Sequence, residues 1–190
     1  MTHKVRRAQR ALLLARRQAI PLEQRRAWDR LITERLLRAF PVRAPLVVAF
    51  YWPMQAEFDP RFVVRAWRDA GARAVLPVVR AQKTPMEFRE WWPGVPTRQG
   101  AYNLPEPLGT DVLRPDVLLV PPVGFDAAGY RLGYGGGFYD RTLAAMSPPP
   151  LKIGVGYELS RMDSIGPLPH DIPMDIVVTE AGVHPAPPPA

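Results

Sequence analysis

The chain has 190 residues, of which 47% are hydrophobic, and it carries a formal charge of +7. This length suits one α/β domain with a packed core, and the hydrophobic content excludes a chain that is disordered throughout. The sequence contains no run of about eighteen apolar residues, so it predicts no membrane helix, and its basic N-terminus lacks the apolar stretch of a secretory signal. The absence of cysteine excludes disulfides, a thiolate nucleophile and Cys-based metal sites. We therefore expect a cytoplasmic protein without a membrane partner.

The positive charge is concentrated in the N-terminal part of the chain. Residues 1–43 hold twelve Lys or Arg and three Asp or Glu, whereas residues 44–190 hold thirteen and fifteen. A basic patch of this kind attracts polyanions such as RNA or a triphosphate, but it is equally consistent with a solvated helix face. An RNA-binding module would also interleave aromatic and basic residues on a strand surface. The sequence has no such pattern, so we expect no nucleic-acid partner.

Two helices are predicted at the start of the chain. Residues 4–17 contain neither Pro nor Gly, and residues 22–38 place apolar side chains at helical spacing. The second helix follows Pro21, a residue that suits the first turn of a helix.

A β–α–β unit follows these helices. The continuous apolar run at residues 46–52 predicts a strand that is buried on both faces, and residues 73–79 predict a second strand. Between them, an Asp-Pro start and the stop at Gly71 predict a helix over residues 60–70. This order implies a right-handed crossover between parallel strands.

The rest of the chain predicts the remainder of one open, mostly parallel sheet flanked by helices. The architecture expected is α/β, three-layered and Rossmann-like, similar to the sugar-phosphate isomerase and CoA-transferase-like folds. We expect one domain over residues 1–183 and a disordered Pro-rich tail at 184–190. The further elements predicted are an outlying strand at 85–92, a Pro- and Gly-rich loop at 94–107, strands at 116–120, 152–157 and 175–179, a long loop after the first of these three, and a helix at 136–146.

A glycine-rich loop, GYRLGYGGGFYDR at residues 129–141, follows the strand predicted at 116–120. Its glycines allow positive φ and a close approach of the backbone to a ligand. Successive backbone amides, the start of the following helix and Arg131 suit phosphate oxygens, and Asp140 suits Mg²⁺ bound to those phosphates.

A flexible glycine turn with a capping aspartate would contain the same residues, because the loop matches neither a Walker A loop nor a dinucleotide fingerprint. The position of the loop favours a ligand, since open α/β sheets bind ligands outside the carboxyl ends of their parallel strands.

The segment PVGFDAAGYRLGYGGGFYDRTL, at residues 122–143, resembles the signature of the 5-formyltetrahydrofolate cyclo-ligase family, also called methenyltetrahydrofolate synthetase. Weaker similarities occur along the chain in the same order as in the family. They are RRAQR at 6–10, FYWPMQAEFDP at 50–60, MEFREW at 86–91, LPEP at 104–107 and IPMDIVVTE at 172–180.

The resemblance implies a site for ATP and Mg²⁺. The Lys-x-x-x-Arg pair with which the family binds the nucleotide corresponds to Arg6 and Arg10, unless a shift in register gives Lys4 the role of the lysine. The magnesium-associated aspartates correspond to Asp140 and Asp175. The nucleotide-binding stretch corresponds to Arg131, Leu132, Gly133, Tyr134, Gly135, Gly136, Gly137, Phe138 and Tyr139.

The resemblance also implies a folate site. Glu57 corresponds to the substrate-binding glutamate, whose carboxylate would accept hydrogen bonds from the pterin ring, and Trp52 to a pocket wall. Met86, Phe88 and Trp91 either line this pocket or belong to the core. The loop residues expected to border the folate are Tyr134, Gly135, Gly136, Gly137 and Phe138.

The reaction implied is the closure of 5-formyltetrahydrofolate, with or without a polyglutamate tail, to 5,10-methenyltetrahydrofolate. ATP would phosphorylate the formyl oxygen, N10 would attack, and phosphate would leave. Arg131 and Arg10 are the catalytic residues predicted, because with Mg²⁺ and the loop amides they would neutralise the charge that develops. No protein nucleophile is required, and we expect a monomer.

One alternative enzyme class is a phosphosugar isomerase or CoA-transferase-like protein, whose sheets also carry glycine loops. Such an enzyme needs a catalytic carboxylate or base opposite a carbonyl group. It predicts neither ATP turnover nor metal-binding aspartates at positions 140 and 175.

Overall fold

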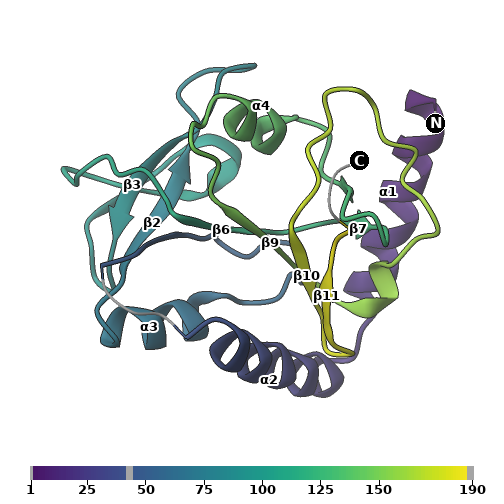
Figure 1. Cartoon of the computed structure of the whole chain (residues 1–190), viewed down its shortest axis with the longest axis horizontal. Coiled ribbons are helices and arrows are strands. Elements are labelled where there is room, and N and C mark those ends of the chain that lie inside the picture. Colours follow the sequence, from purple (N-terminus) through teal and green to yellow (C-terminus); the bar gives the residue numbers. More distant parts are fainter. Residues whose placement is uncertain (1, 42–44, 188–190) are drawn as a thin grey trace.

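A seven-stranded sheet with the order β11-β10-β9-β6-β1-β2-β3 forms the centre of the computed structural model, which describes residues 2–41 and 45–187 (Figure 1). The strands β10, β9, β6, β1 and β2 run parallel, and the edge strands β3 and β11 are antiparallel to their neighbours. The prediction of one open, mostly parallel sheet is confirmed. The strands are β1 (Val47–Ala49), β2 (Arg73–Val78), β3 (Glu87–Trp91), β6 (Val117–Val120), β9 (Leu151–Val155), β10 (Ile176–Val178) and β11 (Val183–Pro185).

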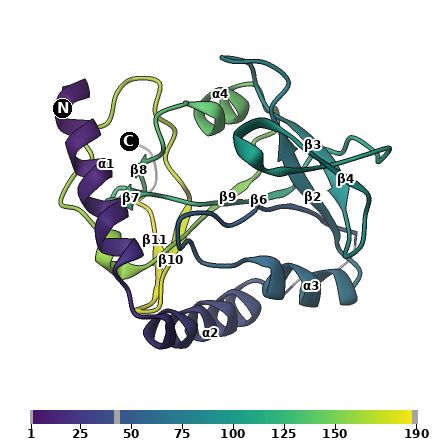
Figure 2. The ribbon, with the colours of Figure 1, turned by 180° about the vertical axis from the view of Figure 1, so that it is seen from behind.

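Helices cover both faces of this sheet, so the molecule has three layers. Helices α2 (Leu22–Ala39) and α3 (Arg61–Asp69) lie along one face, and α4 (Phe138–Ala144) lies on the other (Figures 1 and 2). Helix α1 (His3–Gln18) stands at one end of the molecule, beside β7 (Gly124–Phe125) and β8 (Arg131–Leu132).

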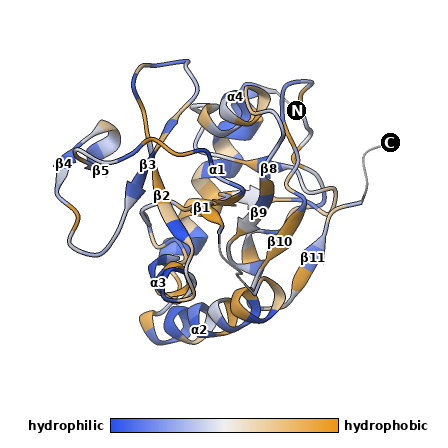
Figure 3. Ribbon diagram, turned by 60° about the vertical axis from the view of Figure 1, so that its left-hand side comes forward, coloured by the Kyte–Doolittle hydropathy of each residue, from blue (hydrophilic) through white to orange (hydrophobic). Residues whose placement is uncertain are grey.

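The sheet separates two hydrophobic clusters. Leu36 of α2 and Trp67 of α3 are buried in the cluster on one side, whereas Leu118 of β6 and Leu143 of α4 are buried in the cluster on the other. The strands β1 and β10 are accordingly hydrophobic, while α2 alternates between hydrophobic and hydrophilic residues (Figure 3). These patterns are those expected for strands buried on both faces and for helices half exposed to water.

The strand predicted at 46–52 is shorter than expected. Strand β1 ends at Ala49, and the chain then turns through Gln55 and Ala56, both of which have positive φ. Phe50 and Tyr51, which follow β1, are buried in the hydrophobic cluster of α2 and α3, and the chain from Tyr51 to Glu57 forms one wall of a large cavity described below.

The Pro- and Gly-rich segment predicted as a loop at 94–107 is instead a small hairpin. Strands β4 (Thr97–Gln99) and β5 (Pro105–Pro107) pair around the short 3₁₀ helix η1 (Ala101–Asn103). The buried carboxylate of Glu106 accepts a hydrogen bond from Arg98, and the absence of a side chain at Gly100 leaves the space that Glu106 occupies.

Four further features differ from the predictions. The long loop expected after residue 120 contains the β7–β8 hairpin, and the helix expected at 136–146 begins only at Phe138, because Gly137 has the left-handed φ of 65°. In the tail expected to be disordered, His184 and Pro185 belong to β11, and residues 188–190 lie outside the described part of the chain. Helix α3 begins at Arg61, whose backbone amide donates to the Asp59 carboxylate.

Within residues 2–41 and 45–187, no helix is both long enough and apolar enough to cross a membrane.

Candidate functional site

A cavity of about 860 Å³ opens at the carboxyl ends of the parallel strands. Segments that follow β1 and β6 and the end of β2 line it, together with α1, the glycine loop and residues 169–172. This is the position at which open α/β sheets bind ligands. Of the predicted site residues, the cavity brings together Arg6, Arg10, Trp52, Glu57, Arg131, Gly133, Tyr134, Gly135, Gly136, Gly137, Phe138, Tyr139 and Asp140.

Helix α1 presents two arginines to the cavity. Arg10 donates from Nε to the Gly133 carbonyl at 2.6 Å, and Arg6 donates to the Asp171 carboxylate at 2.6 Å and to the Gly166 carbonyl at 2.9 Å. The Nε of Arg6 is buried and has no hydrogen-bond partner among the residues that the structure describes. Burial and the charge of Arg6 lower the pKa of Arg10, which indicates a site where an anion would relieve crowded positive charge.

The two residues left open for the role of the family lysine lie in different places. Lys4 is exposed and lies outside the cavity lining, whereas Arg6 is buried on the cavity wall.

The glycine loop runs directly past these arginines. Gly135 has a φ of 99°, and a Cβ there would lie 3.4 Å from the Arg10 guanidinium carbon. At Gly137 a Cβ would approach the Arg141 guanidinium to 2.8 Å, and the Nε of Arg141 is buried without a partner. Two glycines at left-handed φ therefore hold the loop backbone close to two guanidinium groups.

Arg131 organises the floor of this region. Its side chain is 4% exposed and donates to the Asp140 carboxylate at 2.8 Å and to the Ile172 carbonyl at 2.6 Å. The Ile172 amide in turn donates to the same Asp140 oxygen at 3.1 Å. Arg131 thus joins the start of α4 to the segment that precedes β10.

A buried carboxylate stands on another wall of the cavity. Glu57 accepts hydrogen bonds from the Tyr134 hydroxyl at 2.6 Å and from the Met54 amide at 2.9 Å, and Arg17 lies 3.7 Å away. Burial raises the pKa of Glu57, while these two hydrogen bonds and the charge of Arg17 oppose the rise.

Aromatic side chains surround the cavity. Trp52 packs under the Arg61 guanidinium, 4.7 Å from it, and Tyr102 meets Phe138 edge to face at a ring distance of 5.9 Å. Met86 also lines the cavity. Phe88 and Trp91, which were left open between pocket and core, are buried in the two hydrophobic clusters that flank the sheet.

Two predicted site residues lie elsewhere. Leu132 is buried in a small cluster with Leu13 of α1, and its side chain faces away from the cavity lining. The Asp175 carboxylate accepts hydrogen bonds from the backbone and side-chain nitrogens of Lys152, and it is not brought together with Asp140. In the described part of the chain, no three His, Asp or Glu side chains are grouped as metal ligands.

The structure adds residues that sequence reasoning missed. Asp171, Arg141 and Tyr102 line the cavity, and Arg17 contacts Tyr134 behind it. Arg17 had a usable signal, because it continues the inward face of α1, where residues 6, 10, 13 and 17 repeat at helical spacing. Arg141 had another, because it ends the glycine-rich segment 129–141.

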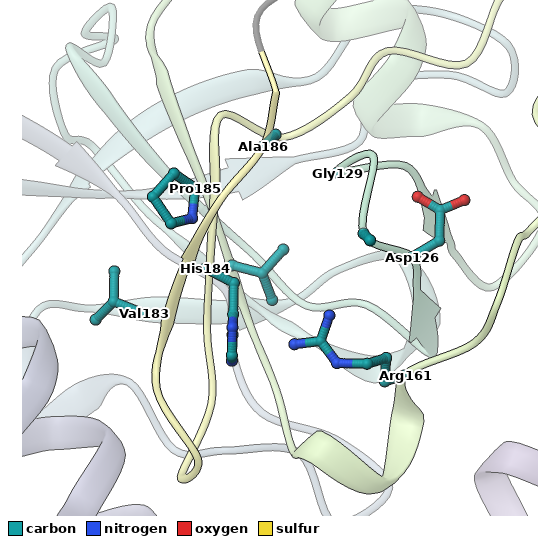
Figure 4. Close-up of a pocket in the computed structure, with 9 residues that line it drawn as sticks. Asp126, Gly129, Arg161, Val183, His184, Pro185 and Ala186 are labelled. Atoms are coloured by element: carbon teal, nitrogen blue, oxygen red, sulfur yellow. The ribbon is translucent and has the colours of Figure 1, made fainter.

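A second, smaller cavity of about 300 Å³ lies beside β11 (Figure 4). Its Arg161 points toward His184, but both groups already have partners. Arg161 is hydrogen-bonded to Glu158, and the His184 Nε2 lies 3.2 Å from the Thr179 hydroxyl and 3.4 Å from Glu158. The large cavity, with its unpartnered guanidinium nitrogens, is the better candidate site.

Comparisons with known proteins agree on one family. Residues 2–180 match the family model described as the 5-formyltetrahydrofolate cyclo-ligase family. The 5-formyltetrahydrofolate cyclo-ligase of Escherichia coli K12 is 31% identical over 180 residues, which cover 90% of this chain and 98% of that protein. The corresponding protein of Mycolicibacterium smegmatis is 34% identical over 140 residues, covering 70% of this chain and 72% of that protein.

Solved structures show the same fold. The 5,10-methenyltetrahydrofolate synthetase of Aquifex aeolicus superimposes with a TM-score of 0.84 and 27% identity, covering 98% of this chain and 95% of that one. The synthetase of Mycoplasma pneumoniae gives a TM-score of 0.77 and 26% identity, covering 92% and 98%. The chain belongs to the 5-formyltetrahydrofolate cyclo-ligase family.

Proposed function

We propose that this chain uses ATP and Mg²⁺ to convert 5-formyltetrahydrofolate into 5,10-methenyltetrahydrofolate, through a phosphorylated formyl group. The observation that carries the proposal is the pairing, in one cavity, of a guanidinium-rich glycine loop with a buried, ionisable carboxylate. The first suits a triphosphate and the second suits the hydrogen-bond donors of a pterin ring. Family membership supports the substrate class.

The residues of the cavity fit a nucleotide. The guanidinium groups of Arg6 and Arg141 line the cavity and would donate hydrogen bonds to phosphate oxygens. Arg10 adds a further guanidinium, and the positive φ at Gly135 and Gly137 keeps the loop clear of side chains. We assign Arg6 and Arg10 to the phosphates.

The fit to magnesium rests on one carboxylate. Mg²⁺ that accompanies a nucleotide commonly needs only one or two carboxylates, since phosphate oxygens and water complete its shell. Asp140 lines the cavity and is the carboxylate that we assign to this role, although it now accepts hydrogen bonds from Arg131 and the Ile172 amide. The role of Asp175 stays a prediction, because it requires that carboxylate to leave Lys152.

The folate subsite is assigned to Glu57 and Trp52. A carboxylate with two oxygens can accept further hydrogen bonds beyond the two that Glu57 already receives. The Trp52 ring supplies an apolar wall for a flat heterocycle.

The chemistry supplied by bound Mg-ATP is transfer of its γ-phosphoryl group to the formyl oxygen, which turns that oxygen into a good leaving group. The part played by this chain is positioning and charge neutralisation. Arg131 and Arg10 sit where they can balance negative charge on the transferred group, and the cavity walls hold the formyl carbon near N10.

The test is a direct assay of the purified protein. Incubation with 5-formyltetrahydrofolate, ATP and Mg²⁺ should produce the near-ultraviolet absorbance of methenyltetrahydrofolate, and omission of ATP or addition of EDTA should abolish it. A folded protein that binds ATP but forms no methenyltetrahydrofolate would contradict the proposal.

A further inference from the structure

We propose that Arg17 is a positioning residue of the folate subsite, acting through the Tyr134 hydroxyl to hold the Glu57 carboxylate and to tie it to the glycine loop. The inference deepens the proposed function and rests on it, because Glu57 is taken as the carboxylate that receives the folate ring. Neither Arg17 nor its contact with Tyr134 belongs to the site predicted from the sequence.

Arg17 connects four segments that are far apart in the chain. It lies in the last turn of α1 with its side chain 4% exposed. Its Nε donates to the Gln55 carbonyl at 3.0 Å, its Nη1 to the Pro122 carbonyl at 3.2 Å, and its Nη2 to the Tyr134 hydroxyl at 2.6 Å. A buried guanidinium with this many partners is a fixed point and not a solvated charge.

The Tyr134 hydroxyl bridges Arg17 and Glu57. It accepts from Arg17 and donates to Glu57 Oε1 at 2.6 Å, so one hydroxyl joins a cation to an anion. Arg17 Nη2 and Glu57 Oε1 are themselves 3.7 Å apart. Hydrogen bonds of this charged kind are short and about twice as strong as neutral ones.

The turn that presents Glu57 needs this support. Gln55 and Ala56 have φ of 48° and 60°, a region that costs non-glycine residues energy and that persists only where surrounding contacts hold it. A hydrogen bond from the Glu57 amide to the Met54 carbonyl at 3.0 Å closes the turn, and Arg17 anchors the Gln55 carbonyl from outside. Loss of Arg17 would therefore release the strained turn as well as the carboxylate.

The charge of Glu57 also depends on Arg17. The groups that face this carboxylate are Arg17 from α1, Tyr134 and Tyr139 from the glycine loop and α4, and Tyr51 after β1. Arg17 is the one cation among them, and burial already raises the pKa of Glu57. Without Arg17 this pKa should rise further, and a protonated Glu57 has lost an acceptor for the pterin donors.

The chain of hydrogen bonds from Arg17 through Tyr134 to Glu57, called the relay below, also links the folate subsite to the loop assigned to ATP. Tyr134 lies between Gly133 and Gly135, in the loop assigned to the phosphates. Its hydroxyl donates to the carboxylate of Glu57, the residue assigned to the folate ring. A folate ring that bonds to Glu57 shares this carboxylate with Tyr134, because the two carboxylate oxygens can accept more than the two hydrogen bonds already present.

The first experiment follows the Glu57 carboxyl in the unliganded protein. The carboxyl carbon is observed by NMR over a pH titration, with its signal assigned from its absence in Glu57→Gln. Arg17→Met keeps an unbranched apolar stem and removes the guanidinium group with its charge. Arg16→Met is the matched control, because Arg16 is an exposed neighbour on the same helix. We expect the Glu57 pKa to rise in Arg17→Met and to match wild type in Arg16→Met.

The second experiment measures dissociation constants for 5-formyltetrahydrofolate and for ATP separately. Arg17→Met should weaken folate binding about tenfold or more, the loss expected for a hydrogen bond to a charged group, and should weaken ATP binding by a smaller factor. Arg17→Lys, which restores the charge without the fork, should recover part of the loss. Tyr134→Phe, a milder change that keeps the ring, tests the relay if Arg17→Met folds poorly.

A double mutant decides whether Arg17 acts through Tyr134. If it does, Arg17→Met combined with Tyr134→Phe should weaken folate binding by clearly less than the product of the two single factors, because both changes break the same chain of hydrogen bonds. Additive losses, or an unshifted Glu57 titration in Arg17→Met, would overturn the inference while leaving the proposed function intact. A wild-type protein that fails to bind 5-formyltetrahydrofolate would instead overturn the proposed function, and the titration would still decide the contact between Arg17 and Glu57.

Discussion

Arg131 illustrates how one side chain can serve both structure and chemistry. It is almost wholly buried, and its two terminal nitrogens donate to Asp140 and to the Ile172 carbonyl. These bonds place the Asp140 carboxylate on the cavity wall and hold the segment before β10 against the start of α4. A buried cation fixed in this way needs no reorganisation when negative charge develops nearby, which is the condition for strong electrostatic stabilisation.

We predict that Arg131→Ala lowers turnover by about 100- to 1,000-fold, as the loss of one preorganised hydrogen-bond donor does in other enzymes. Arg131→Lys should retain part of the activity, because a lysine can keep the charge but not both hydrogen bonds. The turnover number is measured beside the melting temperature, so that loss of folding is separated from loss of chemistry. Near wild-type turnover in folded Arg131→Ala would show that this side chain has no such role.

The two aspartates predicted to serve magnesium occupy different surroundings. Asp140 lines the cavity, whereas Asp175 is paired with Lys152. We predict that Asp140→Asn raises the Mg²⁺ concentration needed for half-maximal activity more than Asp175→Asn does. Lys152→Met is the matched control for loss of the ion pair, and a magnesium requirement that rises equally in both aspartate variants, but not in Lys152→Met, would place Asp175 at the metal as well.

At the scale of elements, each helix is attached by a polar contact in addition to its apolar face. Helix α1 points Arg6 and Arg17 inward beside Leu13, so its inner face builds the site as well as the core. Helix α2 is attached to the end of β9, where the Tyr157 hydroxyl donates to the Asp29 carboxylate at 2.6 Å and the ring packs against Trp28.

The Asp29 contact predicts a pH dependence of stability. Burial raises the pKa of Asp29 to about 6, and the hydrogen bond from Tyr157 opposes the rise. The unfolded pKa is about 4, so between about pH 4 and about pH 6 the folded state binds more protons than the unfolded state. The stability that Asp29 contributes is therefore present below this window and is lost as the pH rises through it.

Asp29→Asn should remove this dependence, because the amide does not titrate. The measurement is the free energy of unfolding by urea at several pH values, taken as the difference between wild type and variant so that other groups cancel. The difference should grow in favour of the variant as the pH rises through the window. A constant difference would contradict the assigned pKa.

At the scale of the molecule, the cavity gathers segments from both ends of the chain. Residues of α1 meet residues 169–172 in its lining. Ligands that bind here should therefore stabilise the fold as a whole, since they join segments that are distant in sequence.

We predict that a non-hydrolysable ATP analogue with Mg²⁺, at 100 times its dissociation constant, stabilises the protein by about 2.7 kcal/mol. For a chain of this size that corresponds to a rise in melting temperature of about 5–10 °C. Arg10→Met should reduce the rise at the same analogue concentration, whereas Arg16→Met should not. An equal rise in Arg10→Met would remove Arg10 from the nucleotide site.

The order of the main elements could be predicted because its causes are local. Buried strands show as short apolar runs, helices show as apolar spacing with caps and stops, and the left-handed φ of Gly71 ends α3 as expected. The glycine loop was found for the same reason, because its residues are contiguous. Hairpins such as β4–β5 were missed, since they depend on partners such as Arg98 and Glu106 and not on an apolar pattern.

Within the site, residues that share one segment could be identified from the sequence, whereas residues that meet only through folding could not. The run from Arg131 to Asp140 is contiguous, so its chemistry could be inferred before any contact was known. The relay from Arg17 through Tyr134 to Glu57 spans positions as far apart as 17 and 134, and nothing local marks it except the inward spacing of Arg17. The same holds for Asp171 beside Arg6 and for Lys152 beside Asp175, because the free energy of a buried charge depends on the partner that tertiary packing supplies.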